Sequence, residues 1–489
     1  MSSPAPKLTT THWLIIVIAS IGFLFDTYEL LMTPLTAPPA IAELLGVDMT
    51  HPAVTEWPGK LLWITALCGG IFGLIGGKLT DVLGRKFVMA ASIFVYSFSP
   101  FCAAYSTSLT MFIFFRSLTF IGVCVEFVAA ITWLAEVFED KHQKEKWLGI
   151  TQAFASLGGL LVTAINVWIL AHMKDLPALG LPAASSWRYL LMTGILPAIP
   201  IALMLPFVPE SKVWKEKKAA GLLKRASIGQ LFAPELRRVT IVTAVLSACA
   251  YGLAFGALQI TPLRIAPGLP ELAETSKKMA PLRKQAAELA VAKQKAAAGS
   301  PEFNDAANKL AVVKSDMAPL DKEVKAVGNK VQFYQEMGGL VGRILLAVLI
   351  MVGLSRVALL KVFQVPALIL LPLTYLSLFT AGGSSFMWAY ALCGLVTVAQ
   401  FSYFGEYLPK VFPMHLRGTG GSFATNVGGR MIGTSMAFVT TNLVAPMISG
   451  DPTKILPIHL AKAAGYVGLS IALLALVVGM FLPEPKSEE

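Results

Sequence analysis

The chain has 489 residues, of which 55% are hydrophobic and only 14% are charged; a soluble domain averages about 25% charged residues. This composition excludes an ordinary soluble domain and indicates a protein that crosses a lipid bilayer several times. The net charge of +11 comes without a basic stripe beside base-stacking aromatic residues, so nucleic-acid binding is not expected. All five cysteines lie in apolar runs without metal-ligand spacing, so no disulfide, metal site or cofactor is expected.

The first apolar run, at about 13–35, carries two carboxylates. It is too long, and its N-terminal flank too weakly basic, for a cleaved signal peptide. Asp26 and Glu29 are three residues apart and therefore share one helix face. A carboxylate at this depth is costly unless it faces a cavity or a partner. Both are therefore candidate functional groups, and hydration of Glu29 near the outer interface is the alternative.

A short polar segment, Gly77–Lys86, separates the next two apolar runs, each of which is long enough to cross a bilayer at ~20 residues per span. Gly84 suits a tight turn that needs a positive φ, and Asp81 is placed to cap or face a helix N-terminus. Arg85 and Lys86 favour the cytoplasmic side, where basic residues accumulate. A charged loop that only sets the topology is the alternative interpretation.

The residue order of this segment resembles the signature between spans 2 and 3 of the major facilitator superfamily, Gly-x-x-x-Asp-x-x-Gly-Arg-Lys/Arg. Val82 stands where the family often has Arg or Lys. The resemblance implies that the segment gates the cytoplasmic side of a transporter. The residues that match are Gly77, Asp81, Gly84, Arg85 and Lys86.

The fourth apolar run, at about 109–138, carries three charged residues. Its segment Arg116–Glu126 resembles Arg-x-x-x-Gly-x-Gly-x-Gly-Gly-Glu of the sugar-porter, metabolite:proton and aromatic-acid:proton symporter branches, although only Gly122 of the four glycines is kept. Ten residues of helix rise by ~15 Å, so Arg116 and Glu126 cannot pair directly. Each needs a partner on another helix, and a structural ion pair is the alternative to a functional role. Glu136 resembles the glutamate that closes this span in the family.

The fifth and sixth runs lead into a basic linker. Gln152 and the pair Gly158–Gly159 lie in the fifth, where small and polar residues favour helix packing. The sixth ends in Pro209–Trp214, which resembles the sugar-porter ending Pro-Glu-Ser-Pro-Arg-Trp and includes its Glu as Glu210, with Lys212 and Val213 in place of Pro-Arg. The basic block 212–238 that follows is expected in the cytoplasm, against anionic headgroups.

The hydropathy pattern breaks after the seventh run, where residues 264–332 are rich in alanine and lysine. Two helical candidates, about 271–297 and 302–330, predict an antiparallel helical hairpin outside the membrane. The segment has twelve Lys and Arg residues, which would place a short loop in the cytoplasm by the positive-inside rule, but that rule does not extend to a segment this long. Counting the spans of the N-terminal half instead places the segment on the outer side of the membrane. A solvated spacer is the favoured interpretation, and a site for an extracytoplasmic partner is the alternative.

The C-terminal half repeats parts of these patterns. The place of the second signature copy reads Gly353–Arg356, without the Asp, so this half is expected to lack most of the hinge. Tyr407–Gly420 resembles the family's Tyr-x-Pro-Glu-x-Phe-Pro-x-x-x-Arg-Gly-Thr-Gly, with Lys410 in place of the Glu, and it contains Arg417. Residues 482–486 resemble the closing Leu-Pro-Glu-Thr-Lys.

The resemblance covers almost the whole chain except 264–332 and implies an all-α fold of twelve transmembrane helices. The expected parts are a six-helix half at 1–211, a cytoplasmic linker at 212–238 and a second half at 239–489 that contains the insertion. It also implies a multi-pass protein of the cell (inner) membrane with both termini in the cytoplasm. In that architecture the binding site lies between the halves near the midplane.

The activity that the resemblance implies is secondary active transport by alternating access. A membrane enzyme is not expected, because the six histidines lie near span ends or in loops without nucleophile–base or metal neighbours. A carboxylate in a low-dielectric cavity can load and release a proton, and the candidates for proton coupling are Asp26, Glu29 and Glu126. The candidates for gating are Gly77, Asp81, Gly84, Arg85, Lys86, Glu136, Glu210 and Arg417.

Two arginines point to the solute. Arg343 and Arg430 are each about ten residues inside a span, and a buried cation needs an anion, from the protein or from the substrate. A planar guanidinium suits a carboxylate, so we expect proton-coupled uptake of a small organic anion such as an aromatic acid. The candidates for substrate binding are Arg116, Gln152, Tyr251, Arg343, Gln400, Tyr403, Asn426 and Arg430.

Three alternatives remain open from the sequence. The two arginines can instead pair with protein carboxylates, namely Glu336, Glu406 or Glu126. Glutamine and asparagine residues within the spans give some support to a sugar or another neutral solute. The chain could also be a transporter-like receptor that binds a partner through 264–332.

Overall fold

The computed structural model describes most of the chain. The described residues are 8–47, 49, 51–138, 140–221, 227–296, 300–451 and 454–485. Every regular element in this part of the chain is a helix. Twelve stretches among the described residues are long and apolar enough to cross a membrane. The predicted all-α fold class with twelve spans is thereby confirmed.

The first six spans form the N-terminal half, and the other six form the C-terminal half. In the N-terminal half the helices are α1 (Thr10–Leu45), α2 (Pro52–Leu83), α3 (Arg85–Ala103), α4 (Leu109–Val137), α5 (Lys141–His172), and the sixth span made of α6 (Ser186–Met192) and α7 (Ala198–Met204). The short helix α8 (Lys212–Ala219) follows in the linker. In the C-terminal half the helices are α9 (Arg237–Leu253), α10 (Ala273–Lys295), α11 (Pro301–Met351), α12 (Arg356–Pro372), α14 (Gly383–Val411), α15 (Arg417–Ser422) and α18 (Pro457–Gly479).

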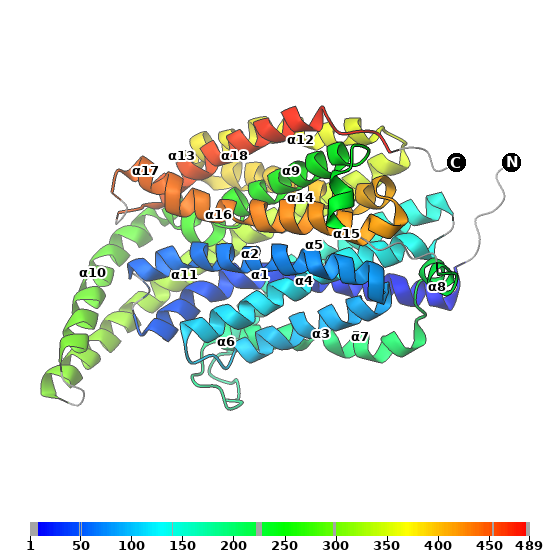
Figure 1. Cartoon of the computed structure of the whole chain (residues 1–489). Coiled ribbons are helices and arrows are strands. Elements are labelled where there is room, and N and C mark those ends of the chain that lie inside the picture. The colour runs from blue at the N-terminus through cyan, green and yellow to red at the C-terminus, as the bar shows by residue number, and fades with distance from the viewer. Residues whose placement is uncertain are drawn as a thin grey trace.

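Each half has its own apolar core, and the two halves pack side by side (Figure 1). The cores of the N-terminal half are built around side chains such as Trp133 and Tyr28, and those of the C-terminal half around Tyr390 and Tyr403. A small apolar cluster joins Leu62 of the first half to residues of the second half. The space between two such rigid bodies is where this architecture places a site.

The insertion forms the expected hairpin, but its second arm does not end at about residue 330. It runs without a break into the eighth span as α11, a single helix of 51 residues. The extramembrane part, from Pro301 to about Val331, is ~45 Å long at 1.5 Å per residue. Figure 1 shows the hairpin at the end of the molecule opposite to α8.

The hairpin has a core of its own, which is separate from the membrane helices. Buried residues of the two arms meet along it, and they are Met279, Ala286, Leu310, Val313 and Met317. The second arm places its inward residues at alternating steps of three and four, which is the pattern of a coiled coil. Most of the large apolar side chains of the hairpin therefore lie in its own seam, with Val291 and Val312 as exposed exceptions, and its outer faces are largely polar.

Three spans of the C-terminal half depart from α-helical geometry, and one of them is the ninth, which contains the π-helical segment η8 (Leu373–Leu378). The seventh span continues α9 through the π-helical segments η4 (Ala254–Leu258) and η5 (Thr261–Ile265), and the eleventh continues α15 through η10 (Phe423–Gly433). Such π segments widen the helix and are frequent at functional sites. Segments η4, η5 and η10 lie where the two halves face each other, since their residues line the cavities between the halves.

Candidate functional site

A cavity with about 700 Å³ of empty space lies between the two halves. The N-terminal half contributes side chains from α1, α4 and α5, and the C-terminal half contributes them from the seventh span, α11, α14 and η10. Five aromatic side chains line it, namely Phe23, Phe127, Tyr251, Phe255 and Phe401. Its charged lining consists of Asp26, Glu336, Arg343 and Arg430. The cavity therefore combines apolar ring faces with groups of both charges, as ligand sites commonly do.

An ion pair between Asp26 and Arg430 crosses this cavity from one half to the other. A guanidinium nitrogen of Arg430 lies 2.8 Å from Asp26 Oδ2, and the two residues are only 1% and 4% exposed. Arg430 also donates to the Val123 carbonyl at 2.7 Å, and its guanidinium lies 5.0 Å from the ring centre of Phe127. Because Asp26 Oδ1 has no hydrogen-bond partner, its carboxylate is only half satisfied inside the protein.

The other two candidate carboxylates have contrasting environments. Glu29 pairs with Arg116 at 3.3 Å, and Arg116 also donates to Thr33 and to the Glu29 carbonyl. Glu126 is fully buried, and neither of its oxygens has a hydrogen-bond partner. A bare carboxylate at such a position is strongly disfavoured, so Glu126 fits the neutral, proton-carrying form.

The cavity brings together some of the candidate substrate-binding residues and leaves others outside. Tyr251, Arg343 and Arg430 line it, and the side chain of Gln152 lies outside the described structure. The described residues that do not line it are Arg116, Gln400, Tyr403 and Asn426. Gln400 donates to Val396 on its own helix, whereas Asn426 donates to Cys124 of the other half at 2.9 Å.

Four polar or charged residues of the cavity were not among the candidate site residues, namely Thr27, Gln259, Gln335 and Glu336. Gln335 donates to Glu336 at 3.2 Å, and Gln332 donates to the same carboxylate oxygen at 2.8 Å. The Tyr390 hydroxyl lies 2.7 Å from the Gln335 amide oxygen and so orients it. Gln335 and Glu336 are adjacent residues at the junction between the hairpin and the eighth span. The polar stretch that contains them, next to an apolar run, was the sequence signal that could have identified them as site residues.

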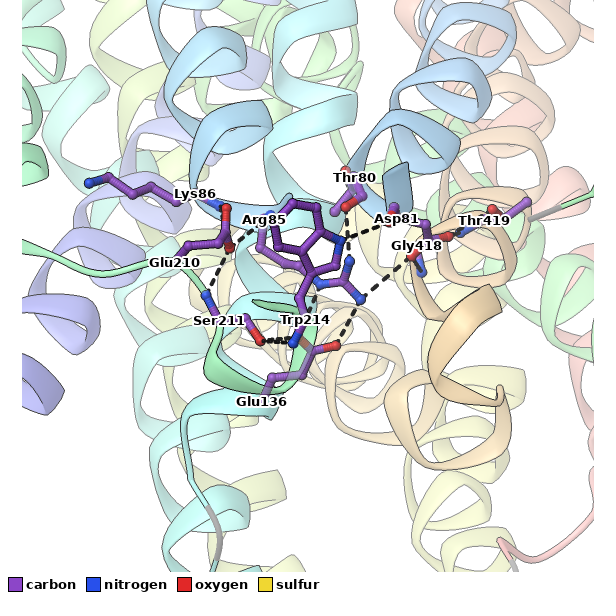
Figure 2. Close-up of polar contacts among 10 residues, drawn as sticks. All are labelled: Thr80, Asp81, Arg85, Lys86, Glu136, Glu210, Ser211, Trp214, Gly418 and Thr419. Carbon is purple, nitrogen blue, oxygen red and sulfur yellow. Dashed lines mark hydrogen bonds and ion pairs between the residues drawn. The ribbon is translucent and has the colours of Figure 1, made fainter. Parts of the chain in front are cut away.

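The hinge motif Gly77–Lys86 lies at one end of the interface between the halves, and Asp81 joins them there (Figure 2). Its carboxylate accepts hydrogen bonds from the backbone N–H of Gly418 at 3.1 Å and of Thr419 at 2.9 Å. The Thr419 hydroxyl donates a third bond at 2.9 Å. These groups lie at the N-terminus of α15, where a negative charge is favoured. A methyl group on Gly77 would come within 2.6 Å of the Gly418 carbonyl, so the backbones also meet closely.

A second network ties the hinge to the rest of the N-terminal half. Arg85 donates to both oxygens of Glu136, at 3.0 and 2.9 Å. Glu210 accepts from the backbone N–H groups of Arg85 and Lys86, each at 3.0 Å. Gly84 has φ +107°, and a side chain there would overlap Glu210. Figure 2 shows these groups around Trp214, whose indole donates to the Asp81 carbonyl.

The expectation that the C-terminal half lacks most of this hinge is wrong for the second network. Arg356 pairs with Glu406 at 3.0 Å, as Arg85 pairs with Glu136. Glu484 accepts from the backbone N–H groups of Arg356 and Val357, at 3.0 and 2.9 Å, as Glu210 does in the first half. The repeated arginine–glutamate–glutamate cluster is present in both halves, and what the second copy lacks is the aspartate that reaches across.

The remaining gating candidate, Arg417, lies at the first residue of α15 and lines a smaller cavity of about 260 Å³ on the hinge side. This cavity and the central one share Phe127. The described residues include no group of three His, Cys, Asp or Glu that could hold a metal ion.

Comparison with known proteins supports the interpretation of the motifs. Residues 53–247 match the family model described as "Sugar (and other) transporter". The niacin transporter NiaP of Acinetobacter baylyi is 24% identical over 205 residues, which are 41% of this chain and 41% of NiaP. The 4-hydroxybenzoate transporter PcaK of the same species is 29% identical over 234 residues, 47% of this chain and 46% of PcaK. The chain thus aligns with less than half the length of these two curated relatives, both of which are named as transporters.

The fold agrees over nearly the full length with a solved structure. The proton:xylose symporter XylE, a major facilitator superfamily protein, superposes with a TM-score of 0.63 at 16% identity, covering 97% of this chain and 96% of XylE. The predicted resemblance is confirmed by these findings. The chain therefore has the fold of the major facilitator superfamily.

Proposed function

We propose that this protein is a secondary transporter that carries a small organic anion across the membrane, coupled to protons, by alternating access. The observation that carries the proposal is the cavity between the halves, with the Asp26–Arg430 pair across it and aromatic rings around it. In this architecture the two halves rock about a central site. A pair that joins the halves inside that site is placed to respond to both the solute and the proton.

The lining of the cavity favours a planar acid. Arg343 and Arg430 supply guanidinium groups, which bind carboxylates in planar, bidentate geometry. The aromatic residues offer flat apolar faces, against which a ring can pack in stacked or edge-to-face geometry. The 4-hydroxybenzoate transporter among the relatives is named for an aromatic acid, which supports this solute class for the present chain.

Proton coupling is assigned to the carboxylates of α1 and α4. Asp26 has one oxygen on Arg430 and one without a partner, and Glu126 lies nearby without any partner. When Asp26 takes up a proton, Arg430 loses its counter-ion and becomes available to a substrate carboxylate. Binding of the anion and of the proton would then reinforce each other. Glu29 is held by Arg116 in a buried pair within its own half, so its part in coupling is the weaker proposal.

A neutral sugar is the second candidate. Gln259 and Gln335 line the cavity, and amide groups suit hydroxyl groups of sugars because they both donate and accept. The likeness to the xylose symporter is consistent with this alternative. A receptor that binds an extracytoplasmic partner through the hairpin is a third proposal; since most of the large apolar residues of the hairpin fill its own seam, such a partner would meet a largely polar surface.

Uptake into proteoliposomes separates these candidates. We expect an imposed inward proton gradient to drive accumulation of an aromatic monocarboxylate, with no accumulation of xylose. Arg343→Gln should lower the apparent affinity for the acid by roughly tenfold or more, since a hydrogen bond to a charged group is worth ~1.5–3 kcal/mol. Accumulation of sugars only, or equal affinity for the acid in Arg343→Gln, would refute the anion assignment.

A further inference from the structure

The central cavity is bounded on the hinge side by the small cavity at Arg417, and it also has a boundary on the side of the hairpin. A cavity of about 260 Å³ lies there, lined by residues of α1, α5, the seventh span and α11. It shares Leu31 and Gln259 with the central cavity. Gln332 lines this outer cavity, and it donates to Glu336, which lines the central one. These residues therefore form the constriction between the two spaces.

Glu336 crosses from one half to the other at this constriction. Its carboxylate lies against Gly159 of α5, at a point where a methyl group on the glycine would overlap the carboxylate and come within 2.9 Å of Leu31. Glu336 is 4% exposed. Because Gly159 has no side chain, α5 leaves a space at this position into which the Glu336 carboxylate fits, and we call this space the glycine socket.

The adjacent glycine has a different task. A methyl group on Gly158 would overlap the backbone of α1 at Leu24, so Gly158 serves packing within the N-terminal half. Gly159 lies about 100° further around the same helix and faces α11 instead. Both glycines were expected to serve helix packing. Gly158 does so within the N-terminal half, whereas Gly159 lies at the interface between the two halves.

The support of Glu336 is rigid. Gln332 and Gln335 both donate to one of its oxygens, and Tyr390 orients Gln335. All three glutamine and glutamate residues belong to α11, the helix that continues outward into the hairpin. The position of the carboxylate is therefore set by how α11 lies against α5.

We propose that the contact of Glu336 with Gly159 is the gate of the hairpin side, and that Glu336 acts as a positioning residue that must leave its socket before solute can pass. This inference rests on the proposed transport function. On the hinge side, Asp81 holds the halves together by reaching a helix N-terminus. On the hairpin side, a carboxylate held by amides fits a glycine socket.

The test measures access to the cavity and needs no solute. A cysteine is introduced at Thr27, which lines the central cavity, and its labelling by a membrane-impermeant thiol reagent is followed by mass spectrometry of the labelled peptide. Reagent is applied to each side of the membrane in turn, and protease digestion of the hairpin in the same vesicles identifies its side. Gly159→Ala should raise the labelling rate from the hairpin side by about 5- to 10-fold.

The matched control lies on the same pair of helices. Gly149→Ala also adds a methyl group on α5 toward α11, but there the nearest atom is Ala347 Cβ at 3.4 Å, an ordinary contact distance. Its labelling rate should equal that of the parent. Glu336→Ala removes the contact without adding atoms, so it should raise the rate even if Gly159→Ala does not fold.

Unchanged or slower labelling in both Gly159→Ala and Glu336→Ala would overturn the gate. The same increase in Gly149→Ala would also overturn it, because the effect would then come from any change between the two helices. A protein that accumulates no organic acid but shows the expected labelling would refute the proposed solute and keep the gate. Normal uptake of the organic acid with unchanged labelling would keep the proposed solute and refute the gate.

Discussion

The contact of Asp81 with Gly418 and Thr419, here called the latch, gives the sharpest prediction for the hinge side. Asp81 accepts three hydrogen bonds from the opposite half, two from backbone N–H groups and one from the Thr419 hydroxyl. Asp81→Asn keeps the size of the side chain but removes the charge and replaces one accepting oxygen by an NH₂ group, which cannot accept. At least one hydrogen bond to a charged group is lost, and such a bond is worth ~1.5–3 kcal/mol.

This loss shifts the balance between the latched and unlatched conformations by roughly 10- to 150-fold. Thr419→Ala is the graded control, because it removes the single hydroxyl bond and leaves the charged carboxylate with both backbone N–H groups; we expect the low end of the same range, about 1.5 kcal/mol, or roughly tenfold.

Labelling of a cysteine at Thr132, which lines the small cavity on the hinge side, reports the change. Impermeant reagent applied from the hinge side should label Thr132→Cys fastest with Asp81→Asn, at an intermediate rate with Thr419→Ala and slowest in the parent. Equal rates in all three proteins, with unchanged thermal unfolding, would show that the bonds seen at Asp81 do not hold the halves together.

Two further predictions concern the buried ion pairs. Asp26→Asn should abolish proton-driven accumulation in proteoliposomes while exchange of the solute across the membrane persists, because Arg430 keeps its place but no proton is exchanged; undiminished accumulation against a gradient would refute the coupling assignment. Glu136→Gln breaks the buried pair with Arg85 and should destabilise the protein by ~3–5 kcal/mol, seen as a lower unfolding temperature in detergent, whereas Glu56→Gln at an exposed pair should cost at most ~1 kcal/mol; similar unfolding temperatures for the two variants would contradict the burial argument.

Local sequence patterns predicted the structure well for features that depend only on neighbouring residues, such as spans and turns. Apolar runs of sufficient length predicted the twelve spans, since a helix is the only single segment that satisfies its backbone in lipid. The hairpin followed from a loss of hydropathy together with helix-forming composition. Its continuation into the eighth span was missed, because nothing local separates an extramembrane helix from a span that extends it.

The partners of the buried charges were less predictable. The sequence restricted Arg116 and Glu126 to partners on other helices, because their separation along one helix is too large. It could not say that Arg116 would meet Glu29, that Glu126 would meet none, or that Arg430 would cross to Asp26 rather than to Glu336, Glu406 or Glu126. Those pairings join residues up to 404 positions apart, and only the packing of the two halves brings them together.

By itself, the sequence determined the class of fold, the spans, the hairpin and the hinge motif, because hydropathy, helix period and turn residues act over a few neighbouring positions. The tertiary structure alone decided which candidates share the cavity, that the second half keeps the arginine–glutamate–glutamate cluster, and that Gly159 receives Glu336. These depend on how two separately packed halves approach each other. The physical reason is that a buried charge or a glycine has the same local signature whether it faces its own half or the other.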